Sequence, residues 1–342
     1  MTQRSHLMDG LRVLAAHVIV LHHLVSYGPL ATTLEQTWPG LHEPLFLYGR
    51  FATQVFLVMA GYLSALSLLS PRPLNLGEQV RKRYLRLMPP FLLAILSVAL
   101  VVTWLRPWIN QDWLTEPPTL WQWLSHALLI QDLVGQPSMT VGAWYVAIDF
   151  QLFVLLNLLV WSLQRLGAGR DILLMLVVGL CLASQWYFNL DPEWDRWAVF
   201  FLESYGVGVL LAWARQEGPG ANKARVGLVL CLISAVVAGL VYPRPRLMLT
   251  VLVCLLLWWG VQRWQPSEPW SNWLRRASDE SYALFVTHFM PLVVANALWI
   301  RWGETSAGWG VALLVVTWGV CVLWSVIFHR SVETLMRKAW RS

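Results

Sequence analysis

Charged residues are scarce in this sequence, and their scarcity excludes most classes of soluble protein. Only 13% of the 342 residues are Asp, Glu, Lys or Arg, whereas soluble domains carry about 25%. Hydrophobic residues make up 57% of the chain. These proportions exclude an ordinary soluble enzyme, a disordered chain and a nucleic-acid-binding protein. The net charge of +6 is better explained by a membrane protein, because such proteins concentrate Lys and Arg on the cytoplasmic side.

Cysteine is equally scarce. The four cysteines are Cys181, Cys231, Cys254 and Cys321, and each lies within an apolar stretch. No Cys-x-x-Cys or His-Cys spacing occurs. We therefore expect small buried hydrophobic residues, with no disulfide framework and no bound metal.

Long apolar runs fill most of the chain and predict ten transmembrane helices, because a span needs about 20 apolar residues. The runs are 12–31, 45–69, 87–105, 141–163, 171–189, 197–214, 224–242, 246–262, 281–302 and 308–329. Their length, without period-two alternation, excludes a membrane β-barrel. The apolar stretch 119–134 is too short to span and is expected in or near an interface. The sequence predicts an all-α, polytopic transmembrane bundle forming a single domain over residues 1–342.

The distribution of basic residues predicts the orientation. With a cytoplasmic N-terminus, the inside segments hold 19 Lys and Arg and the outside segments hold five, while Arg50 falls within a span. This bias places both termini in the cytoplasm.

The first span carries ionisable residues that cost at least ~2.5–3.5 kcal/mol each in a bilayer. Arg12 and His23 are eleven residues apart, which puts them on one helix face, about 20° apart and about 16 Å apart along the axis. His17 and His22 point away from that face. Two interpretations stay open for these histidines: a structural hydrogen bond to a neighbouring helix, or a polar path toward a reactive group.

Asp149 in the fourth predicted span is the natural partner for His23. Helix rise puts Asp149 about 12 Å below the outer face and His23 about 14 Å below it. A carboxylate beside an imidazole orients it and raises its basicity, which suits a general base for a hydroxyl. The alternative is a structural ion pair that holds two helices together.

A basic cluster, residues 81–86, precedes the third predicted span. Arg83 and Arg86 are i,i+3 neighbours, and guanidinium pairs suit phosphate recognition, so they could hold the phosphates of a nucleotide-type cofactor. The alternative is the ordinary positive-inside anchor. Farther along, His288 is expected about 10 Å from the cytoplasmic end of its helix, and Arg50 and Glu203 are expected near the outer face, with a paired structural charge as the alternative.

The 23 tryptophans gather at span ends and in outer segments. The default interpretation is an interfacial aromatic belt, and the alternative is a platform for a sugar ring. Examples are Trp104, Trp108, Trp113, Trp121, Trp123, Trp186, Trp194 and Trp197.

Five segments in order along the chain resemble the signatures of the acyltransferase-3 family of membrane O-acyltransferases. They are MDGLRVLAAHVIVLHH (8–23, a basic residue, ten residues, then His), FLVMAGYL (56–63), RYLRLMPP (83–90), WYVAIDFQLF (144–153) and SYALFVTH (281–288). The resemblance runs from about residue 7 to residue 329. Two positions depart from it: Asp149 stands where Glu is usual, and Ala60 stands where Ser is usual.

The resemblance implies transfer of an acyl group, most often acetyl, from cytoplasmic acyl-CoA to a hydroxyl of an extracytoplasmic carbohydrate such as an exopolysaccharide or O-antigen. The implied setting is the bacterial inner membrane, with other polysaccharide-assembly proteins as further partners. Acyl-CoA is then a co-substrate, and no tightly bound cofactor is expected. We assign catalysis to His23, Asp149 and Arg12. Donor binding is assigned to Arg83, Arg86, Ser281, Tyr282 and His288.

Two other functions remain open. The first is a transporter or flippase for a small anion or lipid-linked sugar, which would use the buried charges as a relay. Such proteins often carry matching broken helices in their two halves, and none stands out in the sequence. The second is a structural membrane subunit of a polysaccharide-assembly complex.

Overall fold

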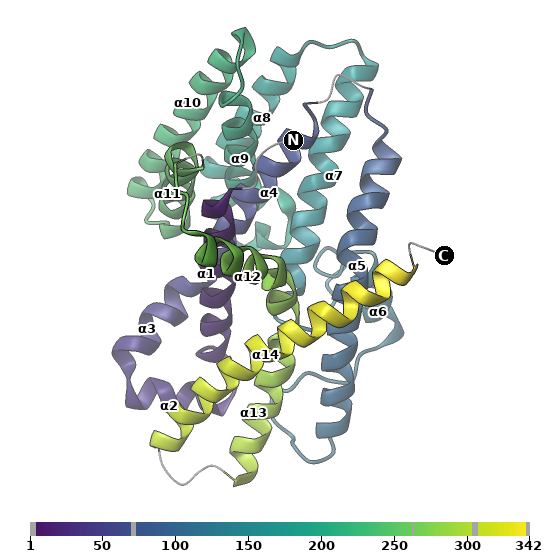
Figure 1. Ribbon diagram of the computed structural model, residues 1–342, viewed down its shortest axis with the longest axis vertical. Helices are drawn as coiled ribbons and strands as arrows, with labels where there is room; N and C mark the ends of the chain where they lie inside the picture. Colours follow the sequence, from purple (N-terminus) through teal and green to yellow (C-terminus); the bar gives the residue numbers. More distant parts are fainter. Residues whose placement is uncertain (1–4, 70–72, 262, 303–306, 340–342) are drawn as a thin grey trace.

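The computed structural model describes residues 5–69, 73–261, 263–302 and 307–339, which form helices joined by short connections (Figure 1). The predicted all-α class is confirmed, since no strand occurs within these ranges. The α-helices are α1 (His6–Leu24), α2 (Pro29–Thr37), α3 (Pro39–Tyr48), α4 (Thr53–Ser67), α5 (Leu76–Leu105), α6 (Leu120–Ala127), α7 (Ala143–Arg165), α8 (Arg170–Trp186), α9 (Leu202–Ala214), α10 (Pro219–Val241), α11 (Pro245–Gly260), α12 (Glu268–Thr287), α13 (Phe289–Trp302) and α14 (Ala307–Ala339). Short 3-10 helices are η1 (Gly49–Ala52), η2 (Phe188–Leu190), η3 (Pro192–Arg196) and η4 (Ala198–Phe201).

The helices make the chain a multi-pass membrane protein. Among the described residues, seven helical segments are long and apolar enough to cross a bilayer, and the bent pair α12–α13 makes an eighth. Two shorter apolar helices, Ala198–Ala214 and Pro245–Gly260, occupy the remaining predicted runs. Residue 262, the last of the eighth predicted run, lies outside the described residues, as do Arg4, Arg72 and Arg341 of the charge count.

The first predicted span, 12–31, extends beyond the end of α1. α1 stops at Leu24, and a turn leads into α2 through Gly28, whose φ of 79° suits a residue without a Cβ. The buried side chain of Asn296 on α13 fixes this turn. It accepts a hydrogen bond from Leu30 N at 3.0 Å and donates one to Tyr27 O at 3.3 Å.

α5 begins eleven residues before the predicted start of its span. The side chain of Asn75 caps it by accepting a hydrogen bond from Glu78 N at 3.2 Å. The basic cluster therefore lies on the helix itself, in its second and third turns. This helical register puts Arg83 and Arg86 on one face.

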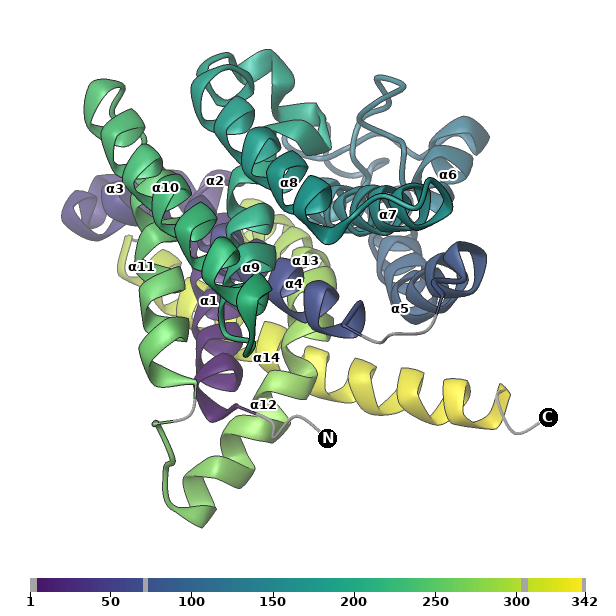
Figure 2. The ribbon, with the colours of Figure 1, turned by 90° about the horizontal axis from the view of Figure 1, so that it is seen from above.

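α1 is central to the bundle, in contact with α4, α11, α12 and α14 (Figure 2). α12 crosses the middle of the molecule and bends by 52° into α13 (Figure 1). The break between the two helices is at His288. Pro291, three residues beyond the break, is the sequence signal for this bend, because proline cannot donate a hydrogen bond to the carbonyl oxygen four residues earlier. The predicted span 281–302 ran straight through it.

Glycines allow α4 and α9 to approach closely. A Cβ at Gly61 of α4 would overlap the carbonyl oxygen of Tyr205, and one at Gly208 of α9 would overlap that of Val58. Small residues at such crossings favour helix association in membranes. This contact holds α4, which lines the cavity described next, against a fully buried helix.

Candidate active site

A cavity of about 760 Å³ opens between α1, α4, α5, α7, α12 and α14. We call it the basic cavity, because four of its side chains are the cations Arg12, Lys82, Arg83 and Arg86. Its acidic side chains are Asp149 and Asp279. Three of the segments that carry the family resemblance therefore contribute basic or acidic groups to one space, although they lie far apart in the sequence.

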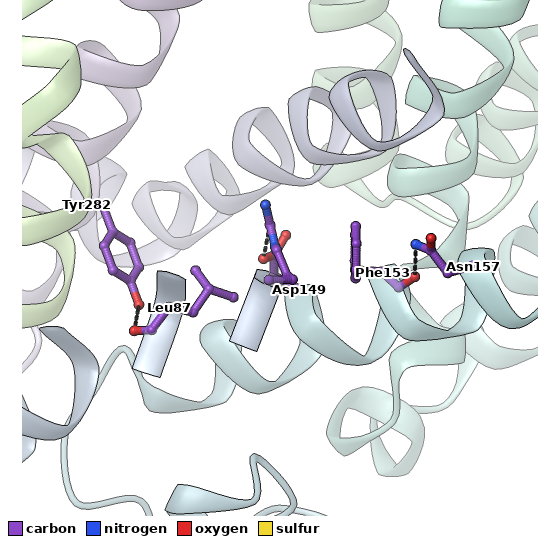
Figure 3. A network of polar contacts seen from close by, with 6 residues as sticks. Leu87, Asp149, Phe153, Asn157 and Tyr282 are labelled. Atoms are coloured by element: carbon purple, nitrogen blue, oxygen red, sulfur yellow. Dashed lines mark hydrogen bonds and ion pairs between the residues drawn. The ribbon is translucent and has the colours of Figure 1, made fainter. Parts of the chain in front are cut away.

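Arg83 and Asp149 form an ion pair within this cavity. Nη2 of Arg83 donates to Oδ2 of Asp149 at 2.5 Å, and the Arg83 guanidinium lies 5.3 Å from the ring centroid of Phe153. Figure 3 shows Asp149, Phe153 and Asn157 following one another along α7. The side chains of Arg83 and Asp149 are 25% and 7% exposed, so the pair is largely shielded from solvent.

The predicted pairing of His23 with Asp149 is wrong. The Oδ2 atom of Asp149 is taken by Arg83, which arrives from α5, and His23 has another partner. The predicted pairing rested only on the depths of His23 on α1 and Asp149 on α7. These depths do not indicate that α5 starts early enough to bring the Arg83 guanidinium to the carboxylate.

The partner of His23 is His288. Nδ1 of His23 lies 2.7 Å from Nε2 of His288, and the two rings are stacked, with centroids 4.9 Å apart and an interplanar angle of 5°. Both side chains are buried, at 7% and 1% exposure. His22 points elsewhere, as helix geometry predicts, and its Nδ1 lies 2.9 Å from the carbonyl oxygen of Leu45.

The hydrogen bonds assign the tautomers of the pair when both rings are neutral. Nδ1 of His288 lies 3.1 Å from the carbonyl oxygen of Leu284, and a carbonyl can only accept, so this nitrogen carries the proton. Nε2 of His288 is then an acceptor, and Nδ1 of His23 donates to it. The remaining nitrogen, Nε2 of His23, carries a lone pair and can accept a proton.

The predicted donor-binding residues divide between these two places. Arg83, Arg86, Ser281 and Tyr282 line the basic cavity, as does Arg12, which was predicted to be catalytic. Tyr282 donates from its hydroxyl to the carbonyl oxygen of Leu87 at 3.1 Å, which joins α12 to α5 (Figure 3). His288 lies beyond this lining, against His23.

A second cavity, also about 760 Å³, lies at the C-terminal end of α1 between α2, α3 and the segment after α5. Its lining includes Ser26, Glu35, Glu43, Gln111 and Trp113. Val25 and Ser26, two and three residues after His23 in the sequence, form one wall. Arg12 on α1 lines the basic cavity, and the residues just after α1 line the second cavity. His23 lies on α1 between these two places.

The profile of the acyltransferase-3 family, described as an acyltransferase domain, matches residues 6–328. The chain belongs to this family. The match covers nearly the whole chain and makes it a membrane acyltransferase. No curated protein and no solved structure matches the chain. Residues from all five motif segments of this acyltransferase line the basic cavity, which makes it the candidate site.

Sequence reasoning missed two features of the acyltransferase's site. The contact of His288 with His23 depends on the bend between α12 and α13, whose signal, Pro291, was not used. The second cavity depends on α2 and α3, most of which lies between the first two predicted spans, 12–31 and 45–69. A signal for His288 was present, since it is an ionisable residue within an apolar run.

Glu203, Arg50 and the four cysteines line neither of the two cavities. Glu203, predicted near the outer face, accepts a hydrogen bond from Ser204 at 2.5 Å, and Ser204 lies 2.6 Å from Thr250. Arg50 lies over the ring of Phe51 at 5.2 Å. The four cysteines are buried and carry no disulfide, as predicted.

Proposed function

We propose that this membrane acyltransferase moves an acyl group, most simply acetyl, from cytoplasmic acyl-CoA to a hydroxyl of an extracytoplasmic carbohydrate. The observation that carries the proposal is the relation of His23 to the two cavities. His23 is buried on α1. Arg12 in the N-terminal half of this helix lines the basic cavity, and Val25 and Ser26 at its C-terminal end line the second cavity. Donor and acceptor can then approach one base from opposite sides.

The basic cavity suits the donor. Its four cationic side chains match the several phosphates of a CoA-type molecule, and guanidinium groups bind phosphate with two hydrogen bonds at once. Arg86 is exposed, whereas Arg83 is engaged by Asp149. We therefore assign the first phosphate contact to Arg86 and Lys82, with Arg83 and Asp149 fixing the wall between α5 and α7.

The second cavity suits the acceptor. It offers carboxylate, amide and indole groups, which hydrogen-bond and stack on sugars, from Glu35, Glu43, Gln111 and Trp113. Gln111 and Trp113 lie in the segment 104–123, which holds five of the tryptophans expected at span ends and in outer segments, Trp104, Trp108, Trp113, Trp121 and Trp123. This assignment makes the segment 104–123 part of the acceptor's approach to the site.

The chemistry follows from the tautomers. Nε2 of His23 takes the proton of the acceptor hydroxyl while the hydroxyl oxygen attacks the thioester carbonyl carbon. A carbon–oxygen bond forms, the carbon–sulfur bond breaks, and the proton passes to the departing sulfur, which gives the ester and free CoA. His288 orients the base, because its Nε2 accepts a hydrogen bond from Nδ1–H of His23. General acid–base assistance of this kind contributes about 10²–10⁴-fold.

Radiolabelled acetyl-CoA, incubated with the purified protein and a panel of glycans, tests the proposal. We expect label on at least one glycan, in an alkali-labile ester, together with stoichiometric release of CoA thiol. Mass spectrometry of polysaccharide from a deletion strain then identifies the acceptor, as the polymer that lacks acyl groups. Transport of a labelled glycan across the membrane without ester formation would favour the flippase alternative instead. Only one bent helix pair occurs among the described residues, so the matched breaks expected of that alternative are not seen in the described part of the chain.

A further inference from the structure

One face of α12 leads from the basic cavity to the histidine pair. Ser278, Ser281, Tyr282 and Phe285 line the cavity, and His288 follows one turn after Phe285 on a helix with 3.6 residues per turn. The ring centroids of Phe285 and His288 lie 6.4 Å apart. Phe285 is therefore the last cavity-lining residue on this helix before the base and its partner.

Phe285 belongs to a cluster of three aromatic rings contributed by three helices. The centroid of Phe56 on α4 lies 5.9 Å from that of Tyr145 on α7 and 5.9 Å from that of Phe285 on α12. The centroids of Tyr145 and Phe285 lie 5.1 Å apart in an edge-to-face arrangement. All three residues line the basic cavity, so the ring cluster forms its end toward the histidines.

The ring cluster has a rigid backing. A Cβ placed at Gly142, the residue that precedes α7, would lie 3.1 Å from Cε1 of Phe285 and 3.3 Å from its backbone oxygen. Phe285 and Tyr145 are only 3% and 8% exposed. Packed interiors cost about 1–3 kcal/mol to overfill, so the rings cannot withdraw toward α7 without a penalty.

We propose that the ring cluster of Phe56, Tyr145 and Phe285 limits the length of the acyl group that the enzyme transfers and favours acetyl over longer chains. This inference rests on the proposed function. With the phosphates of the donor at Arg86 and Lys82, the acyl end of the molecule points toward His23 and meets the ring cluster first. Each added methylene must displace a ring edge, and a single methylene changes discrimination by about 10–200-fold in a tight pocket.

The test compares acetyl-, butyryl- and hexanoyl-CoA as donors for the wild type, Phe285→Leu and Phe285→Ala. Phe91→Leu is the matched control, because Phe91 is fully buried on α5 and is absent from the linings of both described cavities. We expect the wild type to prefer acetyl by at least about tenfold in kcat/KM. The ratio of butyryl to acetyl should rise at least about tenfold in Phe285→Leu, and further in Phe285→Ala, but should not move in Phe91→Leu.

Two results would overturn this inference while the proposed function stands: a wild type that uses hexanoyl as well as acetyl, or a Phe285→Leu variant that transfers acetyl with an unchanged ratio. Phe56→Leu provides a second variant at the same cluster if Phe285→Ala does not fold. If the wild type releases no CoA from any of the three donors, both the proposed function and this inference are contradicted.

Discussion

His23 and His288 face each other with Nδ1 and Nε2 2.7 Å apart and with their rings parallel to within 5°. The two residues are 265 positions apart in the sequence and come from α1 and from the break between α12 and α13. A carbonyl oxygen on the far side of His288 fixes the direction of both hydrogen bonds. The free lone pair of the two histidines is therefore on Nε2 of His23. This imidazole can act as a base although its hydrogen-bond partner is a histidine and not a carboxylate.

Replacement of the base should reduce turnover without unfolding the protein. We expect His23→Ala to lower kcat about 10²–10⁴-fold and to leave the Kd for acyl-CoA within twofold, since Arg86 and Lys82 are distant on α5. His22→Ala is the control, because His22 contacts the backbone of Leu45 instead. An essential His22 together with a dispensable His23 would contradict the assignment.

Replacement of His288 separates a positioning role from donor binding. His288→Ala removes the acceptor for the Nδ1 proton of His23 and frees the tautomer and the ring orientation. We expect kcat to fall about tenfold or more, by less than in His23→Ala, with the KM for acyl-CoA unchanged and the pH profile of kcat displaced. A raised KM for acyl-CoA with an unchanged kcat would instead support the donor-binding role that the sequence suggested.

The Arg83–Asp149 pair should behave as one unit. Asp149→Asn leaves a largely buried guanidinium without its counter-ion, and we expect a loss of about 1–3 kcal/mol in stability, less than for fully buried pairs because a quarter of the Arg83 side chain is exposed. The double variant Arg83→Gln/Asp149→Asn should recover part of that loss, and Asp149→Glu should keep most activity. Thermal unfolding in detergent measures the first two effects, and the acyl-transfer assay measures the activity of Asp149→Glu. Strict additivity of the two single changes would argue that the pair is not coupled.

Donor affinity should depend on Arg86. We expect Arg86→Ala to raise the KM for acyl-CoA about tenfold, and Arg86→Lys to restore it only in part, because an ammonium cannot form the two parallel hydrogen bonds of a guanidinium. Arg165→Ala at the end of α7 is the matched control, since Arg165 does not line the basic cavity. Equal effects of the two alanine variants would mean that the basic cluster acts only as a membrane anchor.

Acceptor affinity should depend on Trp113. We expect Trp113→Ala to raise the acceptor KM about fivefold to tenfold, since stacking on an aromatic ring is worth about 1 kcal/mol, with no change in the KM for acyl-CoA. Trp108 lies in the same segment, is 78% exposed and does not line the second cavity, so Trp108→Ala is the control. If only protein yield falls in both variants, the interfacial belt explains these tryptophans.

The sequence predicted the helical class and a helix in each apolar run, because apolar runs of this length have few other structures available. Of the ten predicted spans, seven, or eight with the bent pair, are long and apolar enough to cross a bilayer in the described part of the chain. The motifs also predicted that Arg86, Ser281 and Tyr282 belong to one binding site, and all three line the basic cavity. The sequence did not predict which helices meet. Asp149 was assigned to His23 on depth alone, whereas the early start of α5 decides its partner. The bend at His288 had a local signal in Pro291, since proline interrupts the helical hydrogen bonds, but the apolar run around it was predicted as one straight span.

The most direct test of the account is an acyl transfer across a membrane. Proteoliposomes containing the wild type or His23→Ala enclose the acceptor glycan, and radiolabelled acetyl-CoA is added outside. We predict label on the enclosed glycan with the wild type, and loss of about 10²-fold or more of that label with His23→Ala although the variant still binds acyl-CoA. Equal labelling of the enclosed glycan by both proteins, or labelling only when donor and acceptor share one compartment, would contradict the account.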